Sequence, residues 1–213
     1  MKTYKVNFTQ RKDFTLFGDG NHPIWDEANS LTDFCSPWDN QPVKKIEFKA
    51  VHNSEKIFFQ FKVDDNQVHI HPSKDKNDSI NNSDRVELFF RSDAKLNPYY
   101  CLEIDTTGRI MDFKAKPNKD FDFNWNWPSK DIQVKSTTET NFFIVEIAIS
   151  LQSLKELNLL KNDSIETGIY RAKYNQQKNG TFEPIWIPWV NPNTETPNFH
   201  TLTSFGLLTL ENQ

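Results

Sequence analysis

Apolar and polar residues alternate with a period of two in segment after segment of this chain, and this pattern constrains the fold most. In residues 45–51, Ile46, Phe48 and Ala50 fall on one side of an extended segment. Residues 56–64 repeat the alternation after a short polar turn, which predicts a β-hairpin. Because successive side chains of a strand point to opposite faces, each such segment is expected to bury one face of a sheet.

The same pattern continues to the end of the 213 residues, which we expect to form a single domain spanning 1–213. Two more hairpins are predicted, one around Gly108, where the turn requires a positive φ, and one at the turn 137–140. A strand roughly every 10 to 15 residues favours an all-β, antiparallel two-sheet sandwich of the jelly-roll or immunoglobulin-like type. The further strands are expected at 85–91, 99–105, 109–113, 131–136, 141–150, 165–174 and 206–211.

Between the strands we expect one short helix, at 151–157, and two long polar loops, at 72–83 and 114–130. Long loops on a sandwich often carry function. Cys35 and Cys101 are too few for a disulfide framework and are expected to be separate thiols.

The charge and hydropathy of the chain exclude two classes of partner. The formal net charge is −4, which does not attract a phosphate backbone, so no nucleic acid partner is expected. No run of about 18 apolar residues occurs, so no membrane span is expected. The first residues lack the apolar segment of a secretory signal, which predicts a cytoplasmic protein, or a periplasmic or secreted one if a leader was removed.

The closing segment gathers aromatic and polar residues beside the last predicted strand. Trp186, Trp189, Phe199 and His200 are the candidates, because sugars stack their C–H faces on aromatic rings while their hydroxyl groups take polar partners. Trp186 and Trp189 are three residues apart, so an extended segment would point them to opposite sides. The alternative is that these rings are core, since most tryptophans are largely buried.

Several charged residues lie within predicted strands. Glu103 and Asp105 share a strand face and would both accept from sugar hydroxyls; the alternative is a solvated face with cross-strand partners. Arg171 would donate to a sugar, pair with one of these carboxylates, or form a buried structural ion pair. Glu87 and Glu146 alternate with apolar neighbours and are expected to face outward or to form salt bridges.

Five short motifs follow one another along the chain. They are Asp19-Gly20 with Ile24-Trp25, the D-x-V-E-type strand 84–90, the strand 99–105 with Gly108, the segment 145–149 with Leu154, and the closing Trp186, Phe199-His200 and Phe205-Gly206-Leu207. In this order they resemble the family 9 carbohydrate-binding modules and their single-domain relatives, over about residues 14 to 210.

This resemblance implies a jelly-roll-like sandwich that binds mono- or oligosaccharides of the xylan or cellulose type without cleaving them. In the family two rings hold a terminal sugar. One ring position corresponds to Phe199; the other corresponds to Asn81, where the ring is lost. A neighbouring tryptophan, Trp125, Trp127 or Trp38, is a candidate for the missing face.

The family also carries structural calcium in some members, for which the oxygens of Asp64-Asp65 are candidates. No other cofactor is expected. A His69-Ile70-His71 pair lacks a clear third metal ligand.

Two other functions remain open at this point. A glycoside hydrolase acting on O-glycosyl bonds would use Glu103 and Asp105 as its acid–base pair, or either of them with Glu87, since hydrolysis needs two carboxylates about 5 to 10 Å apart. A haem-binding sandwich would use Met111 and a histidine as axial ligands.

Overall fold

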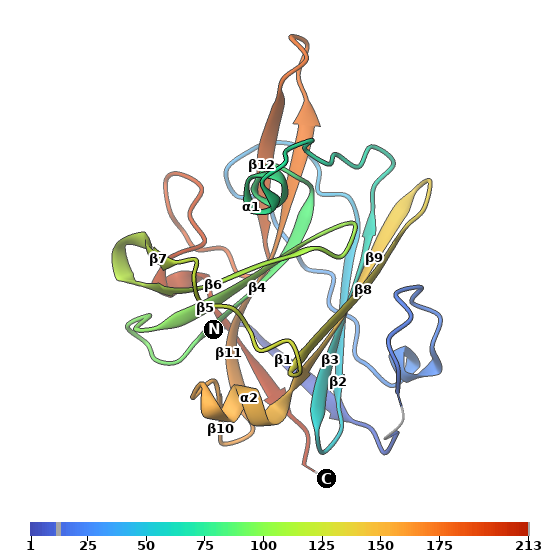
Figure 1. Cartoon of the computed structure of the whole chain (residues 1–213), viewed down its shortest axis with the longest axis vertical. Helices are drawn as coiled ribbons and strands as arrows, with labels where there is room; N and C mark the ends of the chain where they lie inside the picture. The colour runs from blue at the N-terminus through green and yellow to red at the C-terminus, as the bar shows by residue number, and fades with distance from the viewer. Residues whose placement is uncertain (12–13, 213) are drawn as a thin grey trace.

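The computed structural model describes residues 1–11 and 14–212, and its strands form one continuous sheet that curls back on itself (Figure 1). One half of the sheet carries, in spatial order, β7 (Asp120–Asp122), β6 (Ile110–Lys116), β5 (Tyr99–Asp105), β4 (Arg85–Arg91), β11 (Ser164–Gln176) and β13 (Gly206–Leu210). β10 (Leu160–Lys161) and β12 (Phe182–Pro188) also pair with β11. The other half carries β2 (Ile46–His52), β3 (Lys56–Asp64), β9 (Phe142–Ser150) and β8 (Ile132–Thr138).

The first strand, β1 (Thr3–Phe8), joins the two halves. Its residues 3–6 pair in parallel with β13, and its residues 7–8 pair in parallel with β2. The sheet is therefore mixed, and the prediction of a purely antiparallel sandwich is wrong at this strand. Parallel partners lie far apart in the sequence, so no hairpin turn signals them.

The main core lies between the two halves. Phe59 of β3 and Phe90 of β4 meet there, with their ring centroids 6.4 Å apart, and both are fully buried. Burying a phenylalanine side chain contributes about 1.5 to 3 kcal/mol. The many phenylalanines of the chain therefore supply a large share of the driving force for folding.

Three hairpins form where the turn chemistry predicted them, as β2–β3, β5–β6 and β8–β9. Gly108 in the second turn has a φ of 82°, as expected. The predicted short helix is α2 (Leu151–Glu156), whose N-cap Ser150 accepts from the backbone N–H of Ser153. Among the described residues no helix combines the length and the apolar character that a membrane crossing requires.

The two predicted loops contain more structure than expected. Residues 72–83 include the helix α1 (Lys76–Asn81), and residues 114–130 include the end of β6 and all of β7. Short 3₁₀ turns lie at Pro23–Asp26, Pro117–Lys119 and Leu202–Ser204. β12 is a further strand that was not predicted, because Pro184 and Pro188 argue against a strand. The two prolines are tolerated since β12 pairs with β11 alone and is therefore an edge strand.

Glu146 fixes the N-terminal segment against the outer face of β9. Its carboxylate accepts from the backbone N–H groups of Phe17 (3.2 Å), Gly18 (2.8 Å) and Gly20 (3.1 Å), and from the indole N–H of Trp25 (2.9 Å). The sequence predicted an exposed or salt-bridged side chain. Instead Glu146 is buried, because the segment that it binds covers it.

We therefore predict that Glu146→Gln lowers the free energy of unfolding by about 2 to 4 kcal/mol, since an amide cannot accept from all four donors and leaves some of them unpaired. Urea denaturation measures this loss. Glu55→Gln, at an exposed position of the β2–β3 turn, is the matched control and should change the stability by less than about 0.5 kcal/mol. Equal stability of Glu146→Gln and the wild type would contradict the anchoring role.

Candidate functional site

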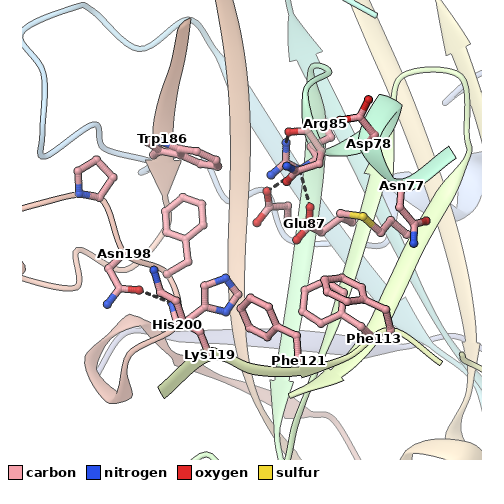
Figure 2. A pocket seen from close by; sticks show the side chains of 16 residues that line it. Asn77, Asp78, Arg85, Glu87, Phe113, Lys119, Phe121, Trp186, Asn198 and His200 are labelled. Carbon is pink, nitrogen blue, oxygen red and sulfur yellow. Dashed lines mark hydrogen bonds and ion pairs between the residues drawn. The ribbon is translucent and has the colours of Figure 1, made fainter. Parts of the chain in front are cut away.

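A pocket of about 580 Å³ lies on the outer face of β4, β5 and β6, away from the main core (Figure 2). β12 and the segment 197–200 form one wall, β7 and its neighbours form the other, and α1 lies along the rim. Its lining residues are Asn77, Asp78, Asn81, Arg85, Glu87, Glu103, Met111, Phe113, Lys119, Phe121, Phe123, Trp186, Pro197, Asn198, Phe199 and His200.

The first wall is aromatic and includes three of the predicted residues, Trp186, Phe199 and His200. The ring of Trp186 stands edge-on to that of Phe199, with centroids 5.6 Å apart and planes at 89°. Phe199 stacks on Tyr170 at 4.0 Å and is only 5% exposed, so one of its faces is already used. Trp186 is the more open ring and is the better stacking surface of the two.

The second wall was missed in the sequence. Phe113 of β6 and Phe121 of β7 have ring centroids 5.1 Å apart, and Phe123 lies 4.8 Å from Phe113 and is 49% exposed. The signal was present, since Phe121 and Phe123 alternate with aspartates at the strand period. This alternation alone does not identify a strand, because the polar composition of 114–130 predicts a loop.

Three buried charges form the floor. The Nε of Arg85 lies 2.9 Å from Oε1 of Glu87 and 2.7 Å from Oε2 of Glu103. Glu87 and Glu103 are cross-strand neighbours on β4 and β5. Neither contact has hydrogen-bond geometry, and all three of these atoms are buried without a hydrogen-bond partner. Figure 2 shows Arg85 and Glu87 facing the cavity between the two aromatic walls.

The guanidinium of Arg85 is held from two other directions. Its Nη1 donates to the carbonyl of Asn81 at 2.7 Å, and its central carbon lies 5.5 Å from the ring centroid of Trp186. Arg85 was not among the predicted site residues, because a charge at the start of a strand normally points to solvent.

The floor holds less negative charge at neutral pH than two free carboxylates would. Burial, together with the neighbouring charge of Glu103, raises the pKa of Glu87 to about 8. Burial also raises the pKa of Glu103 above its usual range. Burial alone would disfavour the charge of Arg85, but the two glutamates raise its pKa further. The pair therefore shares a proton at neutral pH while Arg85 remains charged.

His200 contributes a neutral ring. Burial, with smaller effects of Lys119 and Arg85, lowers the pKa of His200 to about 3. Its Nδ1 lies 3.0 Å from the hydroxyl oxygen of Tyr99, and its ring centroid lies 4.9 Å from that of Phe121. The imidazole thus offers a polar atom to the pocket without adding charge.

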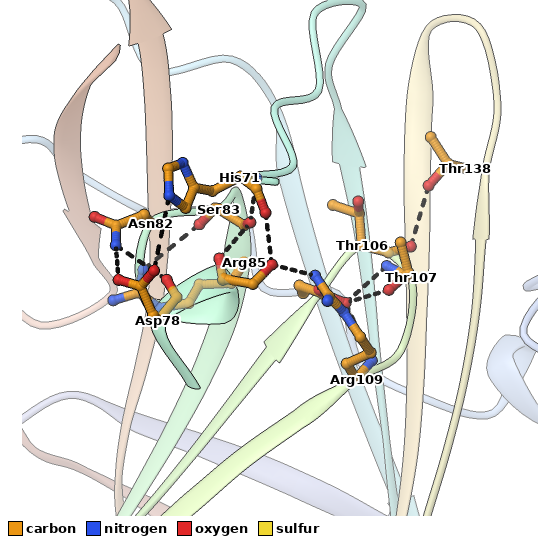
Figure 3. A network of polar contacts seen from close by, with 11 residues as sticks. His71, Asp78, Asn82, Ser83, Arg85, Thr106, Thr107, Arg109 and Thr138 are labelled. Carbon is orange, nitrogen blue, oxygen red and sulfur yellow. Dashed lines mark hydrogen bonds and ion pairs between the residues drawn. The ribbon is translucent and has the colours of Figure 1, made fainter. Parts of the chain in front are cut away.

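A polar network holds α1 over the rim (Figure 3). The Nη2 of Arg109 donates to the hydroxyl of Ser79 at 3.0 Å, and that hydroxyl donates to the carbonyl of His71 at 2.6 Å. The predicted residue Asn81 ends this helix and lines the pocket; its carbonyl accepts from Arg85 and from the hydroxyl of Tyr174. The pocket rim is therefore tied to β4 and to the β5–β6 hairpin.

Two predicted polar residues lie outside the pocket. Asp105 is fully buried and accepts from the backbone N–H of Thr107 and Arg109 and from the Nε of Arg109, so it stabilises the β5–β6 turn. Arg171 points to the opposite face of β11 and pairs with Asp65. Asp105 and Arg171 are thus engaged elsewhere, whereas Glu87, the other partner of Glu103 considered from the sequence, lies beside it together with Arg85.

The other predicted tryptophans do not reach the pocket either. Trp189 is 1% exposed within the core. Trp125 packs on Tyr100 with centroids 4.8 Å apart, and Trp127 donates to the hydroxyl of Ser153. Trp38 lies 6.0 Å from Phe199, outside the lining residues. None of them supplies the ring that Asn81 lacks.

The proposed calcium ligands do not fit a metal at Asp64-Asp65. The carboxylate of Asp65 is buried against Arg171 and against the Nζ of Lys173, which lies 3.1 Å away, so side-chain cations already neutralise it. Within residues 1–11 and 14–212 no group of three or more His, Cys, Asp or Glu side chains is placed to hold a metal ion. His69 of the predicted H-x-H pair stacks on Phe182 at 3.6 Å.

The family model described as Carbohydrate family 9 binding domain-like matches residues 18–213. The chain belongs to this family. The family 9 resemblance inferred from the motifs is thereby confirmed. No curated protein matches the sequence.

Three solved structures share the fold. A candidate carbohydrate-binding protein of Bacteroides uniformis superposes with a TM-score of 0.72 at 17% identity over 99% of both chains. A family 9 module of Caldicellulosiruptor kristjanssonii in complex with glucose gives 0.63 at 13% identity, over 100% of this chain and 97% of the other. The same kind of module in complex with cellotriose gives 0.60 at 13% identity, with 100% and 95% covered.

The floor predicts how the stability of this family 9 domain depends on pH. Glu87 binds its proton more tightly in the folded state, so its contribution is complete below a pH of about 4.5 and is lost as the pH rises through about 8. His200 acts in the opposite sense, but only below the unfolded value of about 6.5. Between pH 6.5 and 8 we therefore expect the free energy of unfolding to fall by about 1 to 2 kcal/mol.

Urea titrations at pH 6.5, 7.25 and 8 measure this fall. In Glu87→Gln, which cannot titrate, the stability should be flat over the same range, whereas the exposed Glu139→Gln should behave like the wild type. A wild-type stability that is constant or rises over this interval would show that the glutamate pair is fully ionised in the folded protein.

Proposed function

We propose that the chain binds carbohydrate, without cleaving it, in the pocket between Trp186 and the phenylalanines of β6 and β7. The support is the family membership together with the pocket itself. Rings on two sides suit the apolar faces of a pyranose. Polar atoms converging at the floor suit its hydroxyl groups.

The observation that carries this proposal is the unsatisfied floor. The Nε of Arg85 contacts Oε1 of Glu87 and Oε2 of Glu103 in ion pairs without hydrogen-bond geometry, and neither carboxylate accepts a hydrogen bond from the described residues. Buried polar groups that lack a well-aligned hydrogen bond are less stable than bonded ones. A ligand that places hydroxyl groups against the floor would supply hydrogen bonds that the two carboxylates lack, which links binding to the charges that the fold buries.

The volume of the pocket suits one or two sugar units rather than a long internal stretch of polysaccharide. We therefore propose recognition of a mono- or oligosaccharide, or of the end of a chain. Because related modules have been solved with glucose and cellotriose, glucans of the cellulose type, followed by xylan, are the first ligands to test. We also propose that this binding contributes to the utilisation of such polysaccharides.

The alternative of a glycoside hydrolase is less well supported by the geometry. Asp105, the predicted partner of Glu103, is tied into the β5–β6 turn and does not line the pocket. The carboxylates that do face the pocket, those of Glu87 and Glu103, approach the same nitrogen of Arg85. Hydrolysis instead needs two carboxyl groups on either side of the scissile bond.

We predict that Trp186→Ala weakens sugar binding at least tenfold, since it removes the larger and more open ring of the first aromatic wall. Calorimetric titration with glucose, cellobiose, cellotriose and xylo-oligosaccharides measures the change. Trp125→Ala is the matched control, because this half-buried tryptophan packs on Tyr100 outside the pocket and should leave affinity unchanged. Equal affinities of the wild type and Trp186→Ala would place the binding surface elsewhere.

We also predict that the wild-type protein releases no reducing sugar from cellulose, xylan or chromogenic glycosides while it binds oligosaccharides. A colorimetric reducing-end assay with micromolar protein checks this. Release that disappears in Glu103→Gln would instead support the hydrolase.

A further inference from the structure

The charges at the pocket floor are unbalanced. Two carboxylates, those of Glu87 and Glu103, share a single guanidinium, that of Arg85. All three side chains are buried, at 1%, 4% and 2% exposure respectively. Burying a charge is unfavourable unless a partner of opposite sign accompanies it. With both carboxylates ionised, the floor would therefore lack one positive charge.

Among the described residues no second cation forms an ion pair with Glu87 or Glu103. His200 is neutral because burial, with smaller effects of Lys119 and Arg85, lowers its pKa. Asp78 on the rim adds a further carboxylate, 53% exposed, which is 3.8 Å from His71. Lys119 on the opposite wall is exposed to solvent and makes no ion pair within the described residues. The cation nearest to the two buried carboxylates is Arg85 itself.

Resting on the function proposed above, we propose that the preferred ligand is an amino sugar, whose protonated amine lies against Glu87 and Glu103 while its ring stacks between the aromatic walls. An ammonium group supplies one positive charge and three N–H donors. Its hydrogen bonds to carboxylates are charge-assisted and stronger than those of a hydroxyl group. It thus corrects the charge imbalance and satisfies both acceptors.

A neutral sugar would satisfy the acceptors but would leave the imbalance in place. Without a ligand, a retained proton neutralises one of the two carboxylates, in keeping with the raised pKa of Glu87. An ammonium group would displace that proton, so both carboxylates become ionised in the complex. N-acetylation of the sugar would remove the charge and should abolish the preference.

Two matched pairs of sugars test this proposal. Calorimetry at pH 6.5, where the sugar amine is protonated, compares glucosamine with glucose and galactosamine with galactose. We expect at least one amino sugar to bind about tenfold or more tightly than its neutral partner. N-acetylglucosamine should bind no more tightly than glucose. An affinity for glucose or galactose that equals or exceeds that of its amino partner in both pairs overturns the proposal and leaves carbohydrate binding intact.

Substitutions then locate the preference. Glu87→Gln and Glu103→Gln keep the shape of the floor and remove one charge each, so each should reduce the ratio of amino-sugar to neutral-sugar affinity to about one. Glu139→Gln, on the turn between β8 and β9, should leave the ratio unchanged. An unchanged ratio in both floor variants, with folding verified by circular dichroism, also overturns the proposal. Failure of every sugar, amino or neutral, to bind at millimolar concentration would instead remove the proposed function.

Discussion

A guanidinium and two carboxylates on the outer face of a sheet are buried only where other segments of the chain cover that face. Arg85, Glu87 and Glu103 occupy such a place, on strands that are buried on both faces. Their cover consists of Trp186 and its neighbours on one side, the phenylalanines of β6 and β7 on another, and α1 at the rim. The pocket is the space that this incomplete cover leaves, so its shape and its charge have one origin.

The alternation of side chains predicted most strands and three hairpins, because each depends on local turn chemistry and on one buried face. The parallel pairings of β1 were not predictable in this way, since one joins the two ends of the chain and the other joins strands separated by residues 9–45, with no hairpin turn in either case. β12 was hidden by two prolines that only an edge strand accepts. β7 was hidden by its length of three residues.

Prediction of the site was limited by a different factor. Alternation assigns Glu87, Glu103 and Glu146 to the faces that point away from the main core, and the structure places them there. Whether such a face is wet or dry depends on which distant segment covers it. That information is absent from any single strand, so buried Glu146 was mistaken for a surface residue and Arg85 was overlooked. Trp186, Phe199, His200, Glu103 and Asn81 line the pocket, whereas Trp189, Trp125, Asp105 and Arg171 do not.

The two aromatic walls belong to segments that the rest of the fold uses little. β12 pairs with β11 alone, and β7 pairs with β6 alone, whereas the floor stands on β4 and β5, central strands with partners on both sides. Folding and ligand choice are thus divided between separate parts of the chain. Exchange of the rings at positions 121, 123 and 186 during divergence of the family would adapt the protein to a new glycan at little cost to the scaffold.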